Sequence, residues 1–211
     1  MTTEAPEAPE APPTEAPTFK LAPPRAAPKT GMPTDGFILI AGLPKGGKTT
    51  IGASIPGAVI LETERGGADR IAGWVQDISD LPTFRKAFAA AVNEPTAKAV
   101  VIDTLDVLLD WLAQDTAEKF GLDNINERKD GVNGFAVAED LNQRVVNLID
   151  RIKTSGKLFV VLAHFKEPKL DGDGKLVISH NINARGKLGS YICGHADLIG
   201  HAFKRPVGAE T

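Results

Sequence analysis

Eight residues near the start of the chain, Gly42 to Thr49, read GLPKGGKT and match the pattern G-x-x-x-x-G-K-[ST]. They follow a short apolar run, residues 37–41 (FILIA), which is typical of a strand buried on both faces. The next segment, Lys48 to Ser54, predicts a short helix that ends before Ile55-Pro56-Gly57. A strand, a glycine-rich turn and a helix in this order indicate a layered α/β domain.

The turn contains the residue types that a phosphate-binding loop requires. Glycines let successive backbone N–H groups point toward phosphate oxygens, and the helix N-terminus adds positive potential. We expect Lys48 to reach the β- and γ-phosphates of a nucleotide and Thr49 to offer its hydroxyl to Mg²⁺. The alternative is a chance glycine-rich turn before a helix. The predicted nucleotide-binding residues are Gly42, Leu43, Pro44, Lys45, Gly46, Gly47, Lys48, Thr49 and Thr50.

The rest of the chain alternates apolar runs with helical patterns. This alternation predicts a mainly parallel sheet with helices between its strands. The expected strands are 58–61, 99–102, 158–163 and 197–203, and the expected helices are 80–92, 105–121 and one that ends near Gly156. Residues 169–178 predict a hairpin around an Asp-Gly turn in the C-terminal part.

The first 36 residues differ in composition from everything after them. Eight of the 15 prolines fall within the first 28 residues, in a repeat that reads EAPEAPEAPPTEAP. Such a segment buries too little apolar surface to offset its chain entropy, so we expect a disordered tail. It lacks the basic start and apolar centre of a secretory signal. The predicted organisation is a tail at 1–36, one domain at 37–205 and a flexible C-terminus at 206–211.

Charge, cysteine content and hydropathy exclude several classes of protein. The net charge is −3, and without the first 36 residues the chain has 21 basic against 22 acidic residues, which excludes a strongly basic nucleic-acid binder. One cysteine, Cys193, excludes a disulfide framework and a multi-cysteine zinc site. No apolar run approaches the roughly 20 residues that a membrane span needs, so we expect a soluble, cytoplasmic protein.

Asp103 ends the predicted strand AVVID and fits the role of the carboxylate that holds Mg²⁺ beside a phosphate-binding loop. The alternative is an ordinary strand-end aspartate that caps the next helix. Thr49 and Asp103 are therefore the predicted metal residues. Asp106, three residues later, reads as an acidic residue in the first turn of that helix.

Two glutamates and a histidine end other predicted strands. A glutamate in Leu61-Glu62-Thr63-Glu64 could polarise a water in line with the γ-phosphate, and we favour Glu64 because it lies further past the strand end. Glu62 is the reserve candidate, and two solvated loop acids are the alternative. His164 ends VVLAH, where it could sense the γ-phosphate or make only a local hydrogen bond.

Together, the segments GLPKGGKTT, LETERGG, VVIDTLD and VVLAH resemble the RecA-like ATPase core. More specifically, they resemble the short phage ATPases described as AAA-domain nucleotide-binding proteins or single-strand annealing recombinases. The resemblance covers roughly Phe37 to Phe203. It implies a RecA-like P-loop NTPase fold, ATP and Mg²⁺ as ligands, and a homo-oligomer or filament. It also implies single-stranded DNA and a single-strand-binding protein as partners, in the cytoplasm of a bacterial host.

The resemblance also implies roles for particular residues. Lys48, Glu64, Asp103 and His164 would be the catalytic set, with His164 in the sensor position. The segment 165–178 would take the place of a DNA-binding loop, with Phe165, Lys166, Lys169 and Lys175 as candidate DNA contacts. Arg185 and Lys187 would act in trans on the ATP site of a neighbouring subunit. The oligomerisation segment that precedes the core in full recombinases is absent, so subunit association is implied by the resemblance alone.

The sequence therefore predicts a slow ATPase coupled to single-stranded DNA in phage recombination or annealing. Two other classes stay open. One is a motor or loader ATPase that acts on a protein partner in replication or packaging. The other is a nucleotide-gated assembly module that does not turn ATP over.

Overall fold

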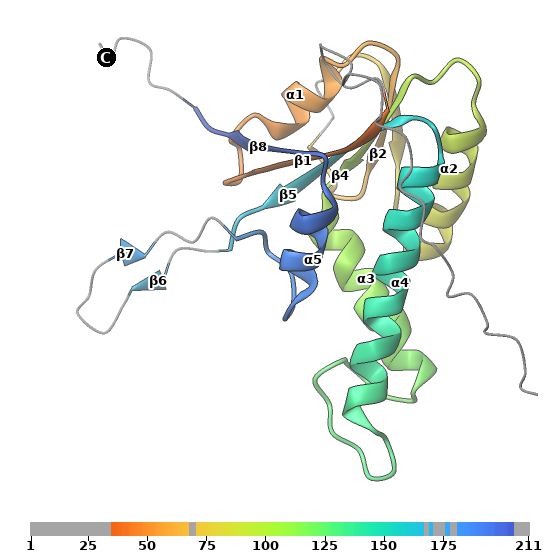
Figure 1. Cartoon of the computed structure of the whole chain (residues 1–211), viewed down its shortest axis with the longest axis vertical. Helices are drawn as coiled ribbons and strands as arrows, with labels where there is room; N and C mark the ends of the chain where they lie inside the picture. Colours follow the sequence, from red (N-terminus) through yellow and green to blue (C-terminus); the bar gives the residue numbers. More distant parts are fainter. Residues whose placement is uncertain (1–34, 68–70, 167–168, 171–175, 178–180, 205–211) are drawn as a thin grey trace, which may run out of the picture. The chain divides into compact units, whose positions relative to one another are not determined.

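The computed structural model of this chain describes residues 35–67, 71–166, 169–170, 176–177 and 181–204. The predicted N-terminal tail, apart from its last two residues, and the predicted flexible C-terminus lie outside this part. The described residues form an α/β domain around a six-stranded sheet (Figure 1). This is the architecture of a RecA-like P-loop NTPase core, as the sequence predicted.

All six strands of the sheet run parallel, in the order β3-β2-β4-β5-β1-β8. The prediction of a mainly parallel sheet is thus confirmed, and the sheet has no antiparallel strand. The strands are β1 (Gly36–Gly42), β2 (Ala58–Glu62), β3 (Trp74–Asp77), β4 (Ala99–Asp103), β5 (Leu158–His164) and β8 (Leu198–Ala202).

The strand register places the predicted site residues at one edge of the sheet. Gly42 pairs with His164 on one side and with Ala202 on the other, and Glu62 pairs with Asp103. Because parallel strands present their carboxyl ends at the same edge, the loops that follow them meet there. This edge is where ligands bind in open α/β sheets.

Five helices complete the described domain: α1 (Lys48–Ala53), α2 (Leu81–Asn93), α3 (Leu105–Lys119), α4 (Gly134–Thr154) and α5 (Leu188–His195). The first four agree with the sequence predictions. Asp80 caps α2 by accepting a hydrogen bond of 2.7 Å from the backbone N of Thr83, and Asn133 caps α4 by accepting one of 2.9 Å from the backbone N of Phe135.

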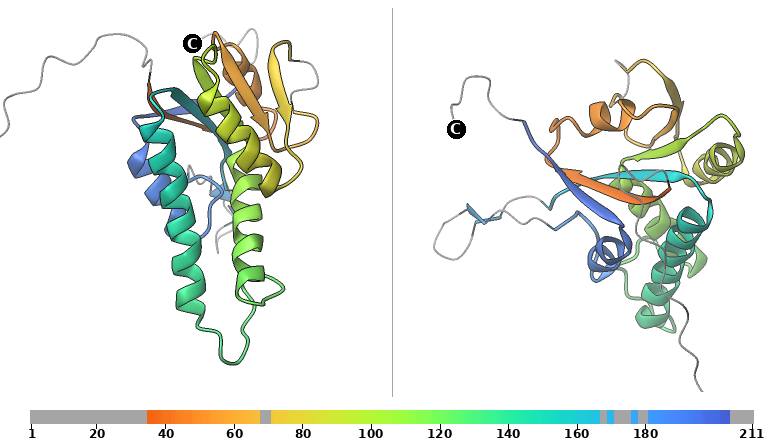
Figure 2. Two further views of the ribbon diagram at one scale, coloured as in Figure 1. Left: turned by 90° about the vertical axis from the view of Figure 1, so that its right-hand side faces the viewer. Right: turned by 45° about the horizontal axis from the view of Figure 1, so that its top comes forward.

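The helices cover the two faces of the sheet unequally. Helix α1 lies on one face, and α2, α3, α4 and α5 lie on the other (Figures 1 and 2). Strand residues alternate between the two cores: Phe37 and Leu39 pack into the larger cluster under the four helices, whereas Ile38 packs into the smaller one. The long helices α3 and α4 continue beyond the sheet as a helical hairpin, which ends in the loop 120–133 (Figure 2).

Two elements of the domain were not predicted. Strand β3 reads WVQD and lies at the sheet edge, where three of its four residues are exposed, so it shows no apolar run. Helix α5 contains Gly189 and Gly194, which weaken a helical pattern, but it buries Leu188 and Ile192 one turn apart. Pairing with β2 therefore decides the strand, and burial of two apolar side chains decides the helix.

The predicted C-terminal hairpin is present as the antiparallel pair β6 (Lys169–Leu170) and β7 (Leu176–Val177). Its turn, residues 171–175, lies outside the described residues. Within the described part of the chain, no helix combines the length and the apolar character that a membrane span requires.

Candidate nucleotide-binding site

The glycine-rich turn between β1 and α1 adopts the backbone that its sequence predicts. Gly47 stands before α1 with φ 92°, a left-handed conformation that glycine adopts without strain. Lys45 also has a positive φ, of 61°. Residues 44–50 line a cavity of about 600 Å³ at the carboxyl edge of the sheet. This volume lies within the range of about 300–1,000 Å³ that is usual for ligand pockets.

Lys48 lies at the centre of this turn and is 5% exposed. Its Nζ donates hydrogen bonds to the carbonyl oxygens of Gly42, at 3.3 Å, and Leu43, at 3.0 Å. Burial lowers the pKa of Lys48, while the charges of Asp103, Asp106 and Glu64 act in the opposite direction. A partly desolvated ammonium held by neutral carbonyls is available to a stronger anionic acceptor, such as a phosphate oxygen.

Thr49 and Asp103, the two predicted metal residues, are in direct contact. The Thr49 hydroxyl donates a hydrogen bond of 2.6 Å to Asp103 Oδ2. Asp103 is 3% exposed, and burial raises its pKa, while this hydrogen bond and the charge of Lys48 lower it. A hydroxyl beside a buried carboxylate is the oxygen-donor pair with which P-loop proteins hold Mg²⁺ next to the phosphates.

His164 is linked to Asp106 as well as to the cavity. Asp106 Oδ2 accepts a hydrogen bond of 2.9 Å from the backbone N of His164 and lies 3.0 Å from its Nδ1. Asp106 does lie in the first turn of α3, as predicted, but the sequence did not indicate this second role. The pair joins the end of β5 to the start of α3 beside the phosphate-binding loop.

The two candidate glutamates lie in different surroundings. Glu64 is exposed and lines the same cavity as Lys48 and Asp103. Glu62 is 5% exposed and lines a neighbouring cavity with Asp77 and Ile78. A Cβ added at Gly67 would lie 3.2 Å from Glu62 Oε1 and 3.8 Å from Thr49 Oγ1. Gly67 therefore packs against the side chains of both Glu62 and Thr49. The placement favours Glu64 as the residue that faces a bound nucleotide.

Several residues of the cavity were not predicted as site residues. Lys204 follows β8, which neighbours β1, so it lies beside the loop that follows β1. The signal that could have found it is the topology: a last strand next to β1 must end beside the phosphate-binding loop. The other unpredicted lining residues are Arg65, Gly66, Gly67 and Thr104.

Gly42 is needed for the close approach of β1 and β8. A Cβ at Gly42 would lie 2.4 Å from the carbonyl oxygen of Ala202, which is closer than real Cβ atoms come. At Gly46, a Cβ would lie 2.9 Å from the carbonyl oxygen of Leu43 and 3.3 Å from that of Ala202. The end of β8 therefore supports the phosphate-binding loop from the side.

Of the candidate DNA contacts, only Phe165 and Lys166 have side chains among the described residues. Phe165 is 8% exposed, and its ring stands edge-on to His201 with the centroids 4.8 Å apart. A buried ring offers no free face to a base, so the stacking role predicted for Phe165 does not fit this structure. Lys166 is half-buried, Lys169 lies in β6, and Lys175 is outside the described residues.

The two candidate trans-acting residues lie away from the residues that line the nucleotide cavity. Arg185 donates a hydrogen bond of 3.2 Å to Asn126 Oδ1 in the loop 120–133, and its guanidinium is 4.0 Å from Asp110. Lys187 precedes α5 and lines a small cavity with Asn142 and Tyr191. Both side chains are exposed, so their predicted action on a second subunit stays a prediction.

A family model described as an AAA domain matches residues 36–207. The chain belongs to this AAA-domain family. The match covers the whole described domain, from the first strand to the end of β8. A search of curated proteins gave no match. AAA domains bind nucleotide, usually with Mg²⁺, and are NTPases in general. The P-loop NTPase character that the sequence predicted is thus confirmed at the level of the family.

The cavity of this AAA domain fits a nucleotide with Mg²⁺. The buried Thr104 Oγ1, in the cavity wall, has no hydrogen-bond partner among the described residues, which is expected where a ligand or its waters complete the contacts. Those residues contain no group of three or more His, Cys, Asp or Glu side chains able to hold a metal ion. Mg²⁺ bound with a nucleotide needs no such group, because phosphates and waters supply most of its ligands.

Proposed function

We propose that this AAA-domain protein binds ATP with Mg²⁺ and hydrolyses it slowly. The observation that carries the proposal is the 2.6 Å hydrogen bond between Thr49 and Asp103, at the base of a cavity that also holds Lys48 and Glu64. The proposal is supported by the presence of an ammonium, a hydroxyl–carboxylate pair and an exposed carboxylate around one cavity. Those are the components that phosphoryl transfer to water requires.

In this proposal each residue has a distinct role. Lys48 exchanges the carbonyls of Gly42 and Leu43 for the β- and γ-phosphate oxygens. Thr49 and Asp103 hold Mg²⁺, which neutralises charge on the phosphates when bound. Glu64 accepts a proton from the water that attacks the γ-phosphorus, and the bond from that phosphorus to the bridging oxygen breaks to leave ADP and phosphate.

In the proposal His164, which lines the cavity, senses the γ-phosphate, and Asp106, 3.0 Å from its Nδ1, positions its ring. The backbone of His164 continues into the segment that carries Lys166 and Lys169. A movement of His164 on loss of the γ-phosphate would therefore shift this basic segment, because only one residue separates His164 from Lys166. We infer that the coupled ligand is single-stranded DNA, in phage recombination or annealing, with phosphate contacts from Lys166, Lys169 and Lys175.

A second candidate function is an ATPase that acts on a protein partner. The burial of Phe165 favours it, because this removes the one aromatic side chain proposed for stacking on bases. The two functions differ in what stimulates hydrolysis. A module that assembles on ATP without turnover is the third possibility, and it would release no phosphate.

One experiment tests these functions together. Phosphate release by the full chain is measured with ATP and Mg²⁺, with and without an oligonucleotide of thymidines, while light scattering follows the oligomer size. We expect slow release that increases several-fold with the oligonucleotide, together with larger assemblies. Release that the oligonucleotide leaves unchanged contradicts the DNA assignment and supports a protein partner. ATP binding without any phosphate release contradicts the ATPase itself.

A further inference from the structure

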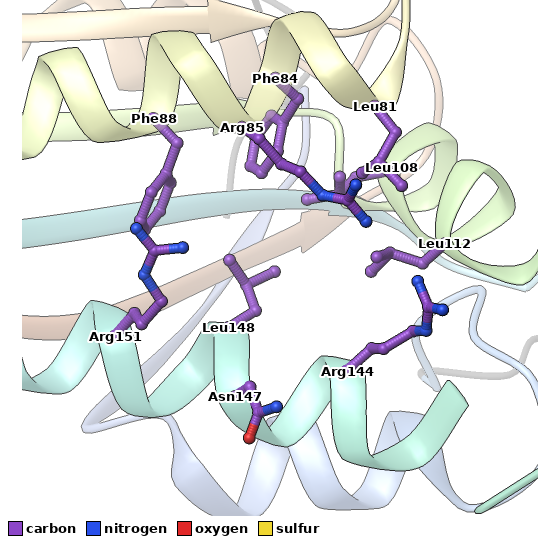
Figure 3. Close-up of a pocket in the computed structure, with 10 residues that line it drawn as sticks. All are labelled: Leu81, Phe84, Arg85, Phe88, Leu108, Leu112, Arg144, Asn147, Leu148 and Arg151. Carbon is purple, nitrogen blue, oxygen red and sulfur yellow. The ribbon is translucent and has the colours of Figure 1, made fainter. Parts of the chain in front are cut away.

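A second cavity, separate from the nucleotide site, lies between α2, α3 and α4 (Figure 3). It is a groove of about 230 Å³ with an apolar floor. Phe84 and Phe88 come from α2, Leu108 and Leu112 from α3, and Leu148 from α4. We call this cavity the helical groove. None of its lining residues belongs to the predicted nucleotide, DNA or trans-acting sets.

Three arginines stand around the floor of the helical groove, one on α2 and two on α4. Figure 3 shows Arg151 over the ring of Phe88, with the guanidinium carbon 5.2 Å from the ring centroid. Within the described residues Arg151 has no carboxylate partner within salt-bridge distance. Its charge is thus held at the groove by an aromatic face and is not neutralised there.

The other two arginines belong to an ion-pair network that joins the three helices. Arg85 lies 3.1 Å from Asp115 Oδ2, and Arg144 pairs with both Asp115 and Asp140. Lys119 also pairs with Asp140. With Arg151, four cations surround two carboxylates, so the groove carries a surplus of positive charge. This surplus stands out in a domain whose net charge is close to zero.

We propose that the helical groove binds an acidic segment of a partner protein that carries one large apolar side chain. The size of the cavity supports this ligand, since an apolar cavity of about 150 Å³ already holds a benzene molecule. The charge surplus supports it as well, because carboxylates flanking the apolar side chain meet Arg151 and Arg85. Guanidinium groups bind carboxylates through paired hydrogen bonds.

A nucleic-acid strand suits the helical groove less well than an acidic peptide. Its phosphates repeat along the strand, and the carboxylates of Asp115 and Asp140, which pair with the groove residue Arg144, would repel them. The floor accepts one apolar group between three helices and is not a surface along which successive bases can stack. A single apolar anchor beside a few carboxylates matches both the floor and the rim.

The test measures the binding of a fluorescein-labelled peptide, one phenylalanine with two aspartates on each side, to the full chain by fluorescence anisotropy. The control peptide has lysines in place of the aspartates. We expect the acidic peptide to bind and the basic peptide to bind at least about tenfold more weakly. Equal binding of the two peptides, or no binding of the acidic one, overturns the proposal.

Variants of the chain locate the binding. Arg151→Glu, which breaks no ion pair, and Leu148→Gln, on the floor, should each weaken the acidic peptide about tenfold. The matched control is Arg128→Glu, an exposed arginine in the loop 120–133, which should leave the affinity within about twofold. An equal loss with Arg128→Glu overturns the assignment to the groove.

Two further measurements separate this result from unfolding and from nucleic-acid binding. ATP binding of Arg151→Glu should match that of the unchanged chain, because Arg151 is outside the nucleotide cavity. Its thermal unfolding should remain cooperative, with a melting temperature only a few degrees lower, because the variant loses the contact of Arg151 with the Phe88 ring. An oligonucleotide of thymidines should not displace the acidic peptide. Displacement that Arg151→Glu abolishes would identify the groove as a nucleic-acid site and overturn the proposal.

Discussion

The two cavities of this domain are built in opposite ways. The nucleotide cavity lies at the carboxyl edge of the sheet, and its wall is mainly loop backbone and strand-end polar groups within short sequence segments. The helical groove is lined by side chains from three helices, which come together only after the domain has folded. A site of the first kind leaves a motif in the sequence, and a site of the second kind does not.

The largest effect that separates the two cavities is expected from Lys48→Ala. Loss of the buried ammonium removes the charge-assisted contacts to the phosphates, which are worth about 1.5–3 kcal/mol each. We expect ATP binding, followed with a fluorescent ATP analogue, to become undetectable and phosphate release to stop. Binding of the acidic peptide to the helical groove should not change. Normal hydrolysis by this variant would show that the nucleotide site is placed wrongly.

The next effect separates the two glutamates near the nucleotide cavity, Glu62 and Glu64. Glu64→Gln keeps the size of the side chain but removes the base, so phosphate release should fall about 100-fold or more while ATP binding remains. Glu62→Gln is the matched comparison, since Glu62 is buried beside Gly67 and does not line this cavity. A loss of turnover with Glu62→Gln alone would transfer the role of base to Glu62.

A smaller effect is expected from Gly42→Ala, which tests how much the nucleotide cavity depends on backbone packing. The new methyl group collides with the carbonyl of Ala202, which should lower the free energy of unfolding by about 1–3 kcal/mol. Calorimetric or circular-dichroism melting measures this loss. Gly134→Ala is the control, because a Cβ at Gly134 meets nothing within 4 Å. Equal stability of the two variants would refute the close approach of β1 and β8.

The smallest effect concerns the rim of the helical groove. Hydrogen bonds from Lys119 and Arg144, and their charges, lower the pKa of Asp140 below its ordinary value. A carboxyl with a lowered folded-state pKa stabilises the fold above its unfolded-state pKa and loses this contribution as the pH falls through the folded-state pKa.

Asp140→Asn should therefore lower the free energy of unfolding by less than about 1 kcal/mol at neutral pH. The difference from the unchanged chain should shrink as the pH falls from the unfolded-state pKa of an aspartate, about 3.9, through the lowered folded-state pKa. Denaturant unfolding at neutral and acidic pH measures it. A difference that stays constant down to pH 2 would mean that Asp140 acts through packing and not through charge.

The same contrast explains how much of the molecule could be predicted from its sequence. The buried strands and the phosphate-binding loop follow from short continuous patterns, and so do Thr49 and Asp103, because a parallel sheet brings strand ends to one edge. The position of Lys204 beside the phosphate-binding loop depends on which strand becomes the neighbour of β1. Local sequence patterns do not determine the order of strands in a sheet. The contact of Asp106 with His164 depends on strand order in the same way, because it requires β5 to be the neighbour of β4.

Phe165 shows the limit of analogy between loops. The resemblance implied that it belongs to a DNA-binding loop, but a backbone bridge to Ile182 and the ring contact with His201 hold it in the core. The helical groove left no sequence signal, since its leucines and phenylalanines read only as the buried faces of three helices. An apolar stripe predicts that a helix face is buried, but it does not predict a groove between the packed helices.

The position of β1 between β5 and β8 has a consequence for biosynthesis. Strand β1 is the earliest of the six in the chain, yet one of its partners follows more than a hundred residues later and the other later still. At about 5–20 residues per second, translation leaves this apolar strand without its first neighbour for roughly 6–24 s and without its second for roughly 8–32 s. The phosphate-binding loop is therefore translated well before the strands that flank β1, and the nascent chain carries an unpaired apolar strand throughout that interval.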